Sequence, residues 1–166
     1  MIDSSAFQSL AEFGIALAGF TSIVVVFGRG DGQLHSLDRF RIRSALVPSL
    51  GASFLALVPV GLELTGLSDV AVWRVSSAVL AVAVAVDSTL NYGRMRQLST
   101  ESIALLSIRL TLFFYSLRLA AFLVGLLNAA GILFAPQPGA YFFAVTCPLL
   151  LGAVVFVRML FVRPAS

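Results

Sequence analysis

Residues 70–90 read VAVWRVSSAVLAVAVAVDSTL, and twelve of them, all uncharged, separate Arg74 from Asp87. With its flanks, this run reaches the length of about 20 residues that a helix needs to cross a bilayer. The alternation of Ala and Val at 78–86 is also typical of a strand, but membrane strands have about 10 residues and alternate apolar with polar ones. We therefore predict a membrane-spanning helix at 69–91, with an ionisable side chain near each end.

The rest of the chain has the composition of a membrane protein. Of its 166 residues, 59% are hydrophobic and 11% are charged, whereas soluble domains carry about 25% charged residues. A chain this apolar has too few polar side chains to cover a surface in water. The net charge of +3 reflects eleven Arg, no Lys and eight acidic residues. Because the arginines lie between apolar runs, the positive charge indicates orientation in a membrane, and we expect no nucleic-acid partner.

Five apolar stretches are long enough to span a membrane, and we predict one transmembrane domain over residues 1–166. Turn-forming stretches such as APQPGA at 135–140 separate the spans. Residues 99–111 begin too polar to span, and predict either an interfacial helix or an extension of the fourth span. Prolines inside the second and fifth spans are expected to kink or loosen those helices. The predicted fold is an all-α integral membrane bundle with helices at 6–28, 42–64, 69–91, 112–134 and 139–161, and with Pro48, Pro59 and Pro148 inside them.

The arginines predict the orientation of the bundle. Cytoplasmic loops of membrane proteins are enriched in Arg. Here the arginines lie in the first loop, the third loop and the C-terminal segment, and none lies in the second or fourth loop. Five spans then place the N-terminus outside and the C-terminus in the cytoplasm. The arginines that count are Arg29, Arg39, Arg41, Arg43, Arg94, Arg96, Arg109, Arg158 and Arg163.

Ionisable side chains within the spans are expected to have partners, because each costs at least about 2.5–3.5 kcal/mol at the bilayer centre. Arg74 has a depth similar to that of Glu12 and Glu63, so we hypothesise that Arg74 pairs with Glu12, with Glu63 nearby. Asp87 and Arg118 share a depth near the other surface and form the second predicted pair. Arg74 and Asp87 lie about 20 Å apart on nearly opposite faces of one helix and cannot pair with each other. The alternatives to a role in transport are that these pairs only hold the bundle together, or that Arg74 and Arg118 snorkel to the interfaces.

The prediction about function depends on Glu12. It lies about two turns into the first span, and its face continues as Ala16, Gly19 and Ile23. A face this narrow permits the close approach of another helix. In a ring of identical subunits, Glu12 is expected to line the outer mouth of a pore and to select cations. The alternative is one buried salt bridge per subunit.

Small residues mark other helix faces that are expected to pack. Such residues let membrane helices approach closely. The stripes are Gly14 and Ala18 in the first span, and Ala121, Gly125 and Asn128, which follow Arg118 along one side of the fourth.

The cluster of Arg39, Arg41 and Arg43 lies just inside the membrane in the predicted topology. It is expected to bind anionic lipid headgroups, although orientation alone explains it equally well. Membrane lipids are therefore predicted partners. The Arg-rich loops also offer a surface for a cytoplasmic protein.

No pattern in the chain predicts a catalytic, cofactor or metal site. The sequence has no HExxH, GxSxG or Walker motif. His35 lies in a polar loop, and Cys147 has the surroundings of a small buried hydrophobe. One His and one Cys do not provide the usual ligands of a metal centre. We expect no enzyme activity and no cofactor.

Three stretches resemble a loose group of small, uncharacterised bacterial polytopic inner-membrane proteins. They are AEFGIALAGFTSIVVVFG at 11–28, DRFRIR at 38–43 and VWRVSS at 72–77. The resemblance implies a bacterial inner-membrane setting and brings no activity, substrate or cofactor. The functional expectation is a homo-oligomer with an ion-conducting pore. The alternative is a non-catalytic structural or accessory subunit of a larger complex, and a membrane enzyme acting on lipid is a third, weaker reading.

Overall fold

The computed structural model describes residues 4–27, 36–98, 107–132 and 135–161. The described residues form five helices and no strand, which confirms the predicted all-α fold. Each helix is long and apolar enough to cross a membrane. The helices are α1 (Ser4–Phe27), α2 (Ser36–Glu63), α3 (Asp69–Met95), α5 (Ile108–Ala130) and α6 (Pro138–Phe161).

The start of α5 decides part of the prediction for residues 99–111, which was either an interfacial helix or an extension of the fourth span. Residues 108–111 belong to the first turn of α5, so this part extends the fourth span. Residues 99–106 lie outside the described residues, as does His35.

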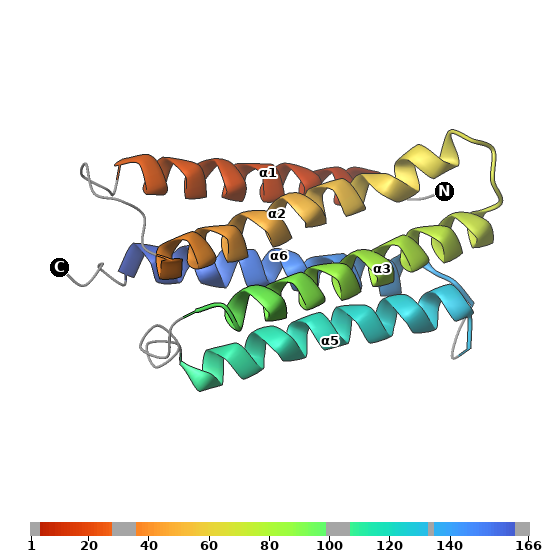
Figure 1. Ribbon diagram of the computed structural model, residues 1–166. Helices are drawn as coiled ribbons and strands as arrows, with labels where there is room; N and C mark the ends of the chain where they lie inside the picture. Colours follow the sequence, from red (N-terminus) through yellow and green to blue (C-terminus); the bar gives the residue numbers. More distant parts are fainter. Residues whose placement is uncertain (1–3, 28–35, 99–106, 133–134, 162–166) are drawn as a thin grey trace.

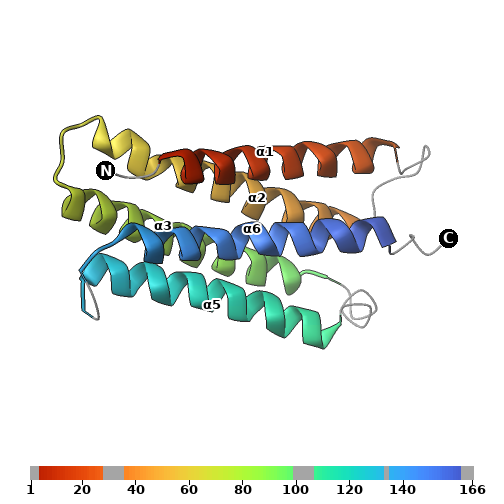
Figure 2. The ribbon, with the colours of Figure 1, turned by 180° about the vertical axis from the view of Figure 1, so that it is seen from behind.

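The helices run side by side along one axis, with α1 and α5 at opposite edges of the bundle (Figures 1 and 2). α2 packs against α1 and α6, and α5 packs against α3 and α6. α1 begins and α6 ends at opposite ends of the bundle, as an odd number of antiparallel helices requires (Figure 1). α2 begins at one end of the bundle, and α3 and α6 end there. We call this the Arg-rich end. It carries Arg39, Arg41, Arg43, Arg94, Arg96, Arg109 and Arg158.

Glycines set the closest helix contacts. A Cβ atom at Gly14 of α1 would collide with Ser53 and with the backbone of Ser49 in α2, and one at Gly152 of α6 would also collide with Ser49. The Ser49 hydroxyl donates to the Ala45 carbonyl at 2.7 Å, and the Ser53 hydroxyl donates to the Ser49 carbonyl at 3.1 Å. Both hydroxyls are thus satisfied within α2, and α1 and α6 can pack directly on it.

An aromatic cluster fills the end of the bundle at which α1 begins. The ring centroid of Phe7 lies 5.7 Å from that of Trp73 and 5.9 Å from that of Tyr141. These side chains come from α1, α3 and α6, and all three are buried. Trp73 and Tyr141 are therefore part of the core.

A tyrosine compensates for a proline inside α2. Pro59 has no N–H group, so it cannot bond to the carbonyl four residues earlier, that of Leu55. The hydroxyl of Tyr141 donates to this carbonyl instead. α2 continues unbroken through both of its prolines. At Pro59, the freed carbonyl has found a donor in a neighbouring helix.

The perimeter of the bundle is apolar. Phe13, Phe54 and Leu119 expose 55%, 72% and 57% of their surface. Soluble monomers rarely expose large contiguous apolar patches. With five helices of spanning length, this surface indicates a multi-pass membrane protein.

Candidate functional site

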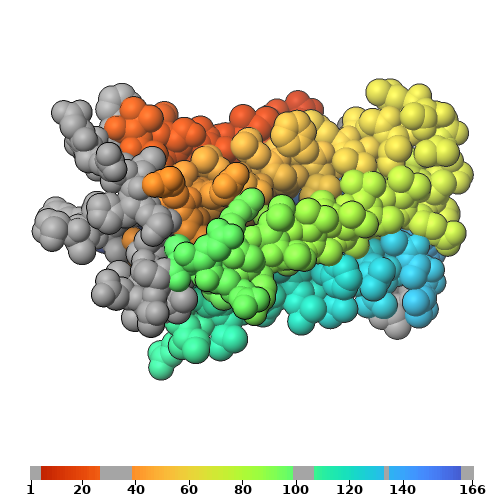
Figure 3. Space-filling view, in the orientation of Figure 1, coloured from red at the N-terminus to blue at the C-terminus, as the bar shows by residue number. Residues whose placement is uncertain are grey.

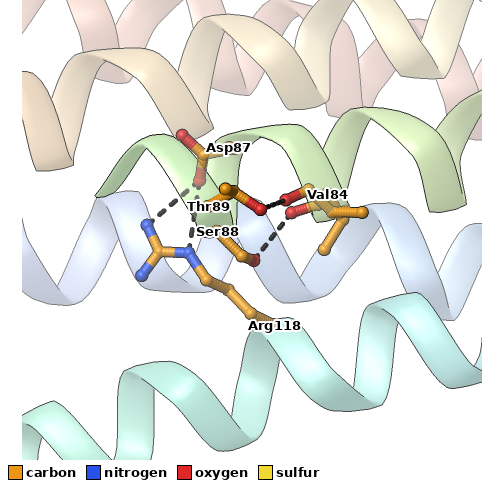
Figure 4. A network of polar contacts seen from close by, with 6 residues as sticks. Val84, Asp87, Ser88, Thr89 and Arg118 are labelled. Atoms are coloured by element: carbon orange, nitrogen blue, oxygen red, sulfur yellow. Dashed lines mark hydrogen bonds and ion pairs between the residues drawn. The ribbon is translucent and has the colours of Figure 1, made fainter. Parts of the chain in front are cut away.

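The predicted pair of Asp87 and Arg118 forms, and it joins α3 to α5 (Figure 4). The Nε and Nη2 atoms of Arg118 both donate to Asp87 Oδ2, at 3.2 and 3.1 Å. The side chain of Arg118 is 7% exposed and that of Asp87 is 25% exposed. A guanidinium buried to this degree requires a counter-charge, which Asp87 supplies.

Asn91 completes the surroundings of the guanidinium. With its amide oxygen turned towards Arg118, Asn91 accepts from Nη2 at 2.6 Å and from Nη1 at 3.2 Å. On a third side, the ring of Tyr115 lies 5.8 Å from the guanidinium carbon, a distance at which a cation and an aromatic face attract. We call Asp87, Asn91, Tyr115 and Arg118 the charge network.

A second polar contact ties the same two helices nearer their other ends. Asn128 Nδ2 donates to Ser77 Oγ at 2.7 Å and to the Gln137 carbonyl at 3.1 Å. The backbone N–H of Gln137 donates to Asn128 Oδ1 at 3.0 Å. The predicted stripe on α5 is its buried face, made of Arg118, Ala121, Gly125 and Asn128.

The predicted pair of Arg74 with Glu12 does not form, so that prediction is wrong. α1 packs mainly against α2 and α6, and no ion pair links Arg74 to Glu12 or Glu63 within the described part of the chain. Arg74 Nη2 lies beside Gly131 at the C-terminal end of α5, where the helix dipole favours a positive charge. Glu12 lies on the exposed side of α1 and accepts a hydrogen bond from Gln8 Nε2 at 3.0 Å.

A groove of about 400 Å³ lies beside the charge network, between α2 and α3, and residues of α5 and α6 complete its wall. Apolar side chains line most of it, and Asp87, Arg94 and Arg118 lie at its Arg-rich end. The molecular surface is hollowed between these two helices (Figure 3). A small adjoining pocket shares these three charged residues and adds Arg43.

The three arginines that were predicted to bind lipid headgroups differ in position. Arg43 lines the small pocket next to Asp87 and Arg94. Arg39 and Arg41 lie closer to the start of α2 and line neither pocket.

Sequence reasoning missed Asn91 and Arg94 as members of this site. The signal was present, because Asn91 and Arg94 follow Asp87 by four and seven residues and therefore share its face of the helix. The contact of Ser77 with Asn128 was not predicted, since two neutral polar residues in separate spans give no sign that they meet.

No family model, curated protein or solved structure matches this chain. Its function is therefore inferred from the contacts of the described residues.

Proposed function

We propose that this protein assembles with copies of itself in a bacterial inner membrane and conducts cations, with Glu12 at the mouth of the pore. The observation that supports this most is the position of Glu12 on the exposed side of α1, with Gln8 as its hydrogen-bond donor. Carboxylates inside membrane spans almost always face protein or water. A neighbouring subunit and an aqueous lumen would provide both.

The exposed face of α1 suits contact with another subunit. Gln8, Glu12, Ala16 and Gly19 all lie on it, and a Cβ atom at Gly19 would meet nothing within 4 Å. The opposite face, with Gly14, packs on α2 within the subunit. Small residues on a second face allow another helix to approach as closely.

A conducting path would run between subunits. The interior of one subunit is filled with buried side chains such as Leu80, Val145 and Leu151. In a ring with cyclic symmetry, each copy contributes its Glu12 at the same depth. A ring of carboxylates selects cations.

The orientation in this proposal follows the arginines. The N-terminus and Glu12 lie towards the outside, and the Arg-rich end lies in the cytoplasm, where anionic headgroups and a protein partner are the expected contacts. No catalytic step, cofactor or nucleic acid is part of the proposal.

The alternative function is a structural or accessory subunit of a larger complex. It is favoured by the charge network and the contact of Asn128 with Ser77, which tie α3 to α5 without a lumen. In that case the α1 face would bind a different protein.

Conductance measurements test the pore directly. Purified protein in liposomes is expected to conduct cations in preference to anions, and Glu12→Gln is expected to reduce that preference at least severalfold. Glu63→Gln, at the end of α2, is the matched control and should leave selectivity unchanged. Unchanged selectivity in Glu12→Gln would remove Glu12 from the mouth. A monomer without conductance would overturn the pore and leave the accessory role.

A further inference from the structure

We infer that the groove between α2 and α3 binds one anionic phospholipid, with an acyl chain along the groove and the phosphate at the Arg-rich end. The groove is formed by α2, α3, α5 and α6 and includes no residue of α1. This inference goes beyond the proposed pore, because an isolated subunit would bind the lipid equally well.

The length of the groove matches one leaflet of a bilayer. On α2 it runs from Val47 to Leu55, and on α3 from Ala83 to Arg94, which is about 12 Å and about 16 Å at the rise of a helix. One leaflet contributes about half of the hydrocarbon thickness of about 30 Å. Its volume also falls in the range of about 300–1,000 Å³ that is typical of small-molecule sites.

The lining suits an acyl chain. Val47, Leu55, Val84 and Leu151 provide apolar walls. At the rim, Val86 and Leu90 are about half exposed, so the groove opens sideways, towards the lipid that would surround these spans. A Cβ atom at Gly51 would meet nothing within 4 Å, and this space is open to a ligand.

The charge at the Arg-rich end suits a phosphate. Arg43, Arg94 and Arg118 against Asp87 give three positive charges and one negative charge, a formal net of +2. Arg118 already donates to Asp87. Arg43 and Arg94 form no ion pair among the described residues, so their guanidinium groups have donors for a phosphate, which Arg binds in bidentate geometry.

A lipid is favoured over a soluble anion because the acidic ligand must also fill an apolar channel. A free phosphate would use the arginines and leave about 400 Å³ of apolar groove without an occupant. A phospholipid of the same leaflet satisfies both parts at once.

Native mass spectrometry in a mild detergent tests the chain-binding half of the site. We expect one phosphatidylglycerol per subunit to be retained, at least about fivefold more tightly than phosphatidylcholine. Gly51→Phe places a ring in the groove and should reduce retention of phosphatidylglycerol at least tenfold. Gly61→Phe is the control, because Gly61 lies in the same helix and a Cβ atom there would also meet nothing within 4 Å. This variant should retain the lipid. Equal retention by the two variants would overturn the inference.

The headgroup half has its own test, which does not depend on filling the groove. Arg94→Gln should weaken phosphatidylglycerol about fivefold, the effect of one arginine near a lipid surface. It should weaken phosphatidylcholine less, because the choline cation of that lipid offsets the charge of its phosphate. Arg96→Gln is the control, since Arg96 lies at the same end but lines neither pocket. If both variants weaken the lipid equally, the arginines attract headgroups without a site, and the inference is wrong.

Discussion

Arg118 and Asp87 lie 31 residues apart in the chain, and two nitrogens of the arginine donate to one oxygen of the aspartate. Together with the contact of Asn128 with Ser77, this pair fixes α3 to α5 at two heights. Ser77 and Asp87 are ten residues apart on α3, a rise of about 15 Å. The register of these two helices therefore sets one wall of the groove and the position of its charged end.

The charge network predicts strong coupling between Asp87 and Arg118. Asp87→Asn and Arg118→Gln should each lower the free energy of unfolding by about 2–3 kcal/mol. This is below the loss of about 3–5 kcal/mol for a fully buried pair, because Asp87 is a quarter exposed. The double variant should recover at least about 1 kcal/mol relative to the sum. Unfolding of the purified protein in detergent, followed by circular dichroism, measures these losses.

Arg74→Gln is the control for that cycle, since Arg74 lies on the same helix without an ion pair among the described residues. It should cost less than about 1 kcal/mol. Strictly additive losses in the cycle would show that the pair contributes no interaction of its own.

The hydrogen bond from Tyr141 to the Leu55 carbonyl is predicted to stabilise the protein only because Pro59 leaves that carbonyl without a donor. Tyr141→Phe should cost about 1–2 kcal/mol, because it leaves a buried carbonyl without a donor. Pro59→Ala restores an N–H four residues after Leu55, so Tyr141→Phe should cost measurably less in that background. The same unfolding assay applies, and an equal cost in both backgrounds would contradict the role assigned to the hydroxyl.

Gly14 is predicted to tolerate no side chain. Gly14→Ala would drive a methyl group into Ser53 and the backbone of Ser49, and overpacking of this kind costs about 1–3 kcal/mol. Gly61→Ala has open space at its Cβ position and should be neutral or slightly stabilising, since Ala favours a helix over Gly. Thermal unfolding in detergent separates the two, and similar midpoints would exclude the tight contact of α1 with α2.

Asn128→Ala is predicted to loosen α3 from α5 and from the start of α6. It removes the partners of Ser77 Oγ and of the Gln137 N–H and should cost about 1–2 kcal/mol. Thr89→Ala is the control. Its exposed hydroxyl bonds only to its own helix, at Ala85, so a loss within about 0.5 kcal/mol is expected. Equal losses would assign no structural role to Asn128.

The sequence predicted well how deep each charged residue lies along its span. It predicted poorly which helices lie next to one another. The span predicted at 69–91 became Asp69–Met95, because the length of an apolar run reports directly on what a bilayer accepts. Asp87 and Arg118 were paired correctly because α3 and α5 happen to be neighbours as well as equal in depth. Arg74 and Glu12 share a depth too, but α1 lies against α2 and α6.

Packing decides these neighbours, and it depends on shapes that a single sequence does not reveal. Gly14 and Gly152 bring α1 and α6 onto α2 because a serine on α2 faces each of them. The groove likewise exists because small residues of several helices, such as Gly51, Ala83 and Ala121, meet around one space. Each is unremarkable in its own span.

Disulfide crosslinking in native membranes tests most directly whether α1 is the contact between subunits. In a Cys147→Ala background, Ala16→Cys would place a thiol on the exposed face of α1, one turn after Glu12. Leu119→Cys on α5, at the opposite edge of the bundle and also exposed, is the control. We predict disulfide-linked dimers from Ala16→Cys upon oxidation and monomers from Leu119→Cys. Monomers from Ala16→Cys, or equal crosslinking of both variants, would contradict the proposed assembly.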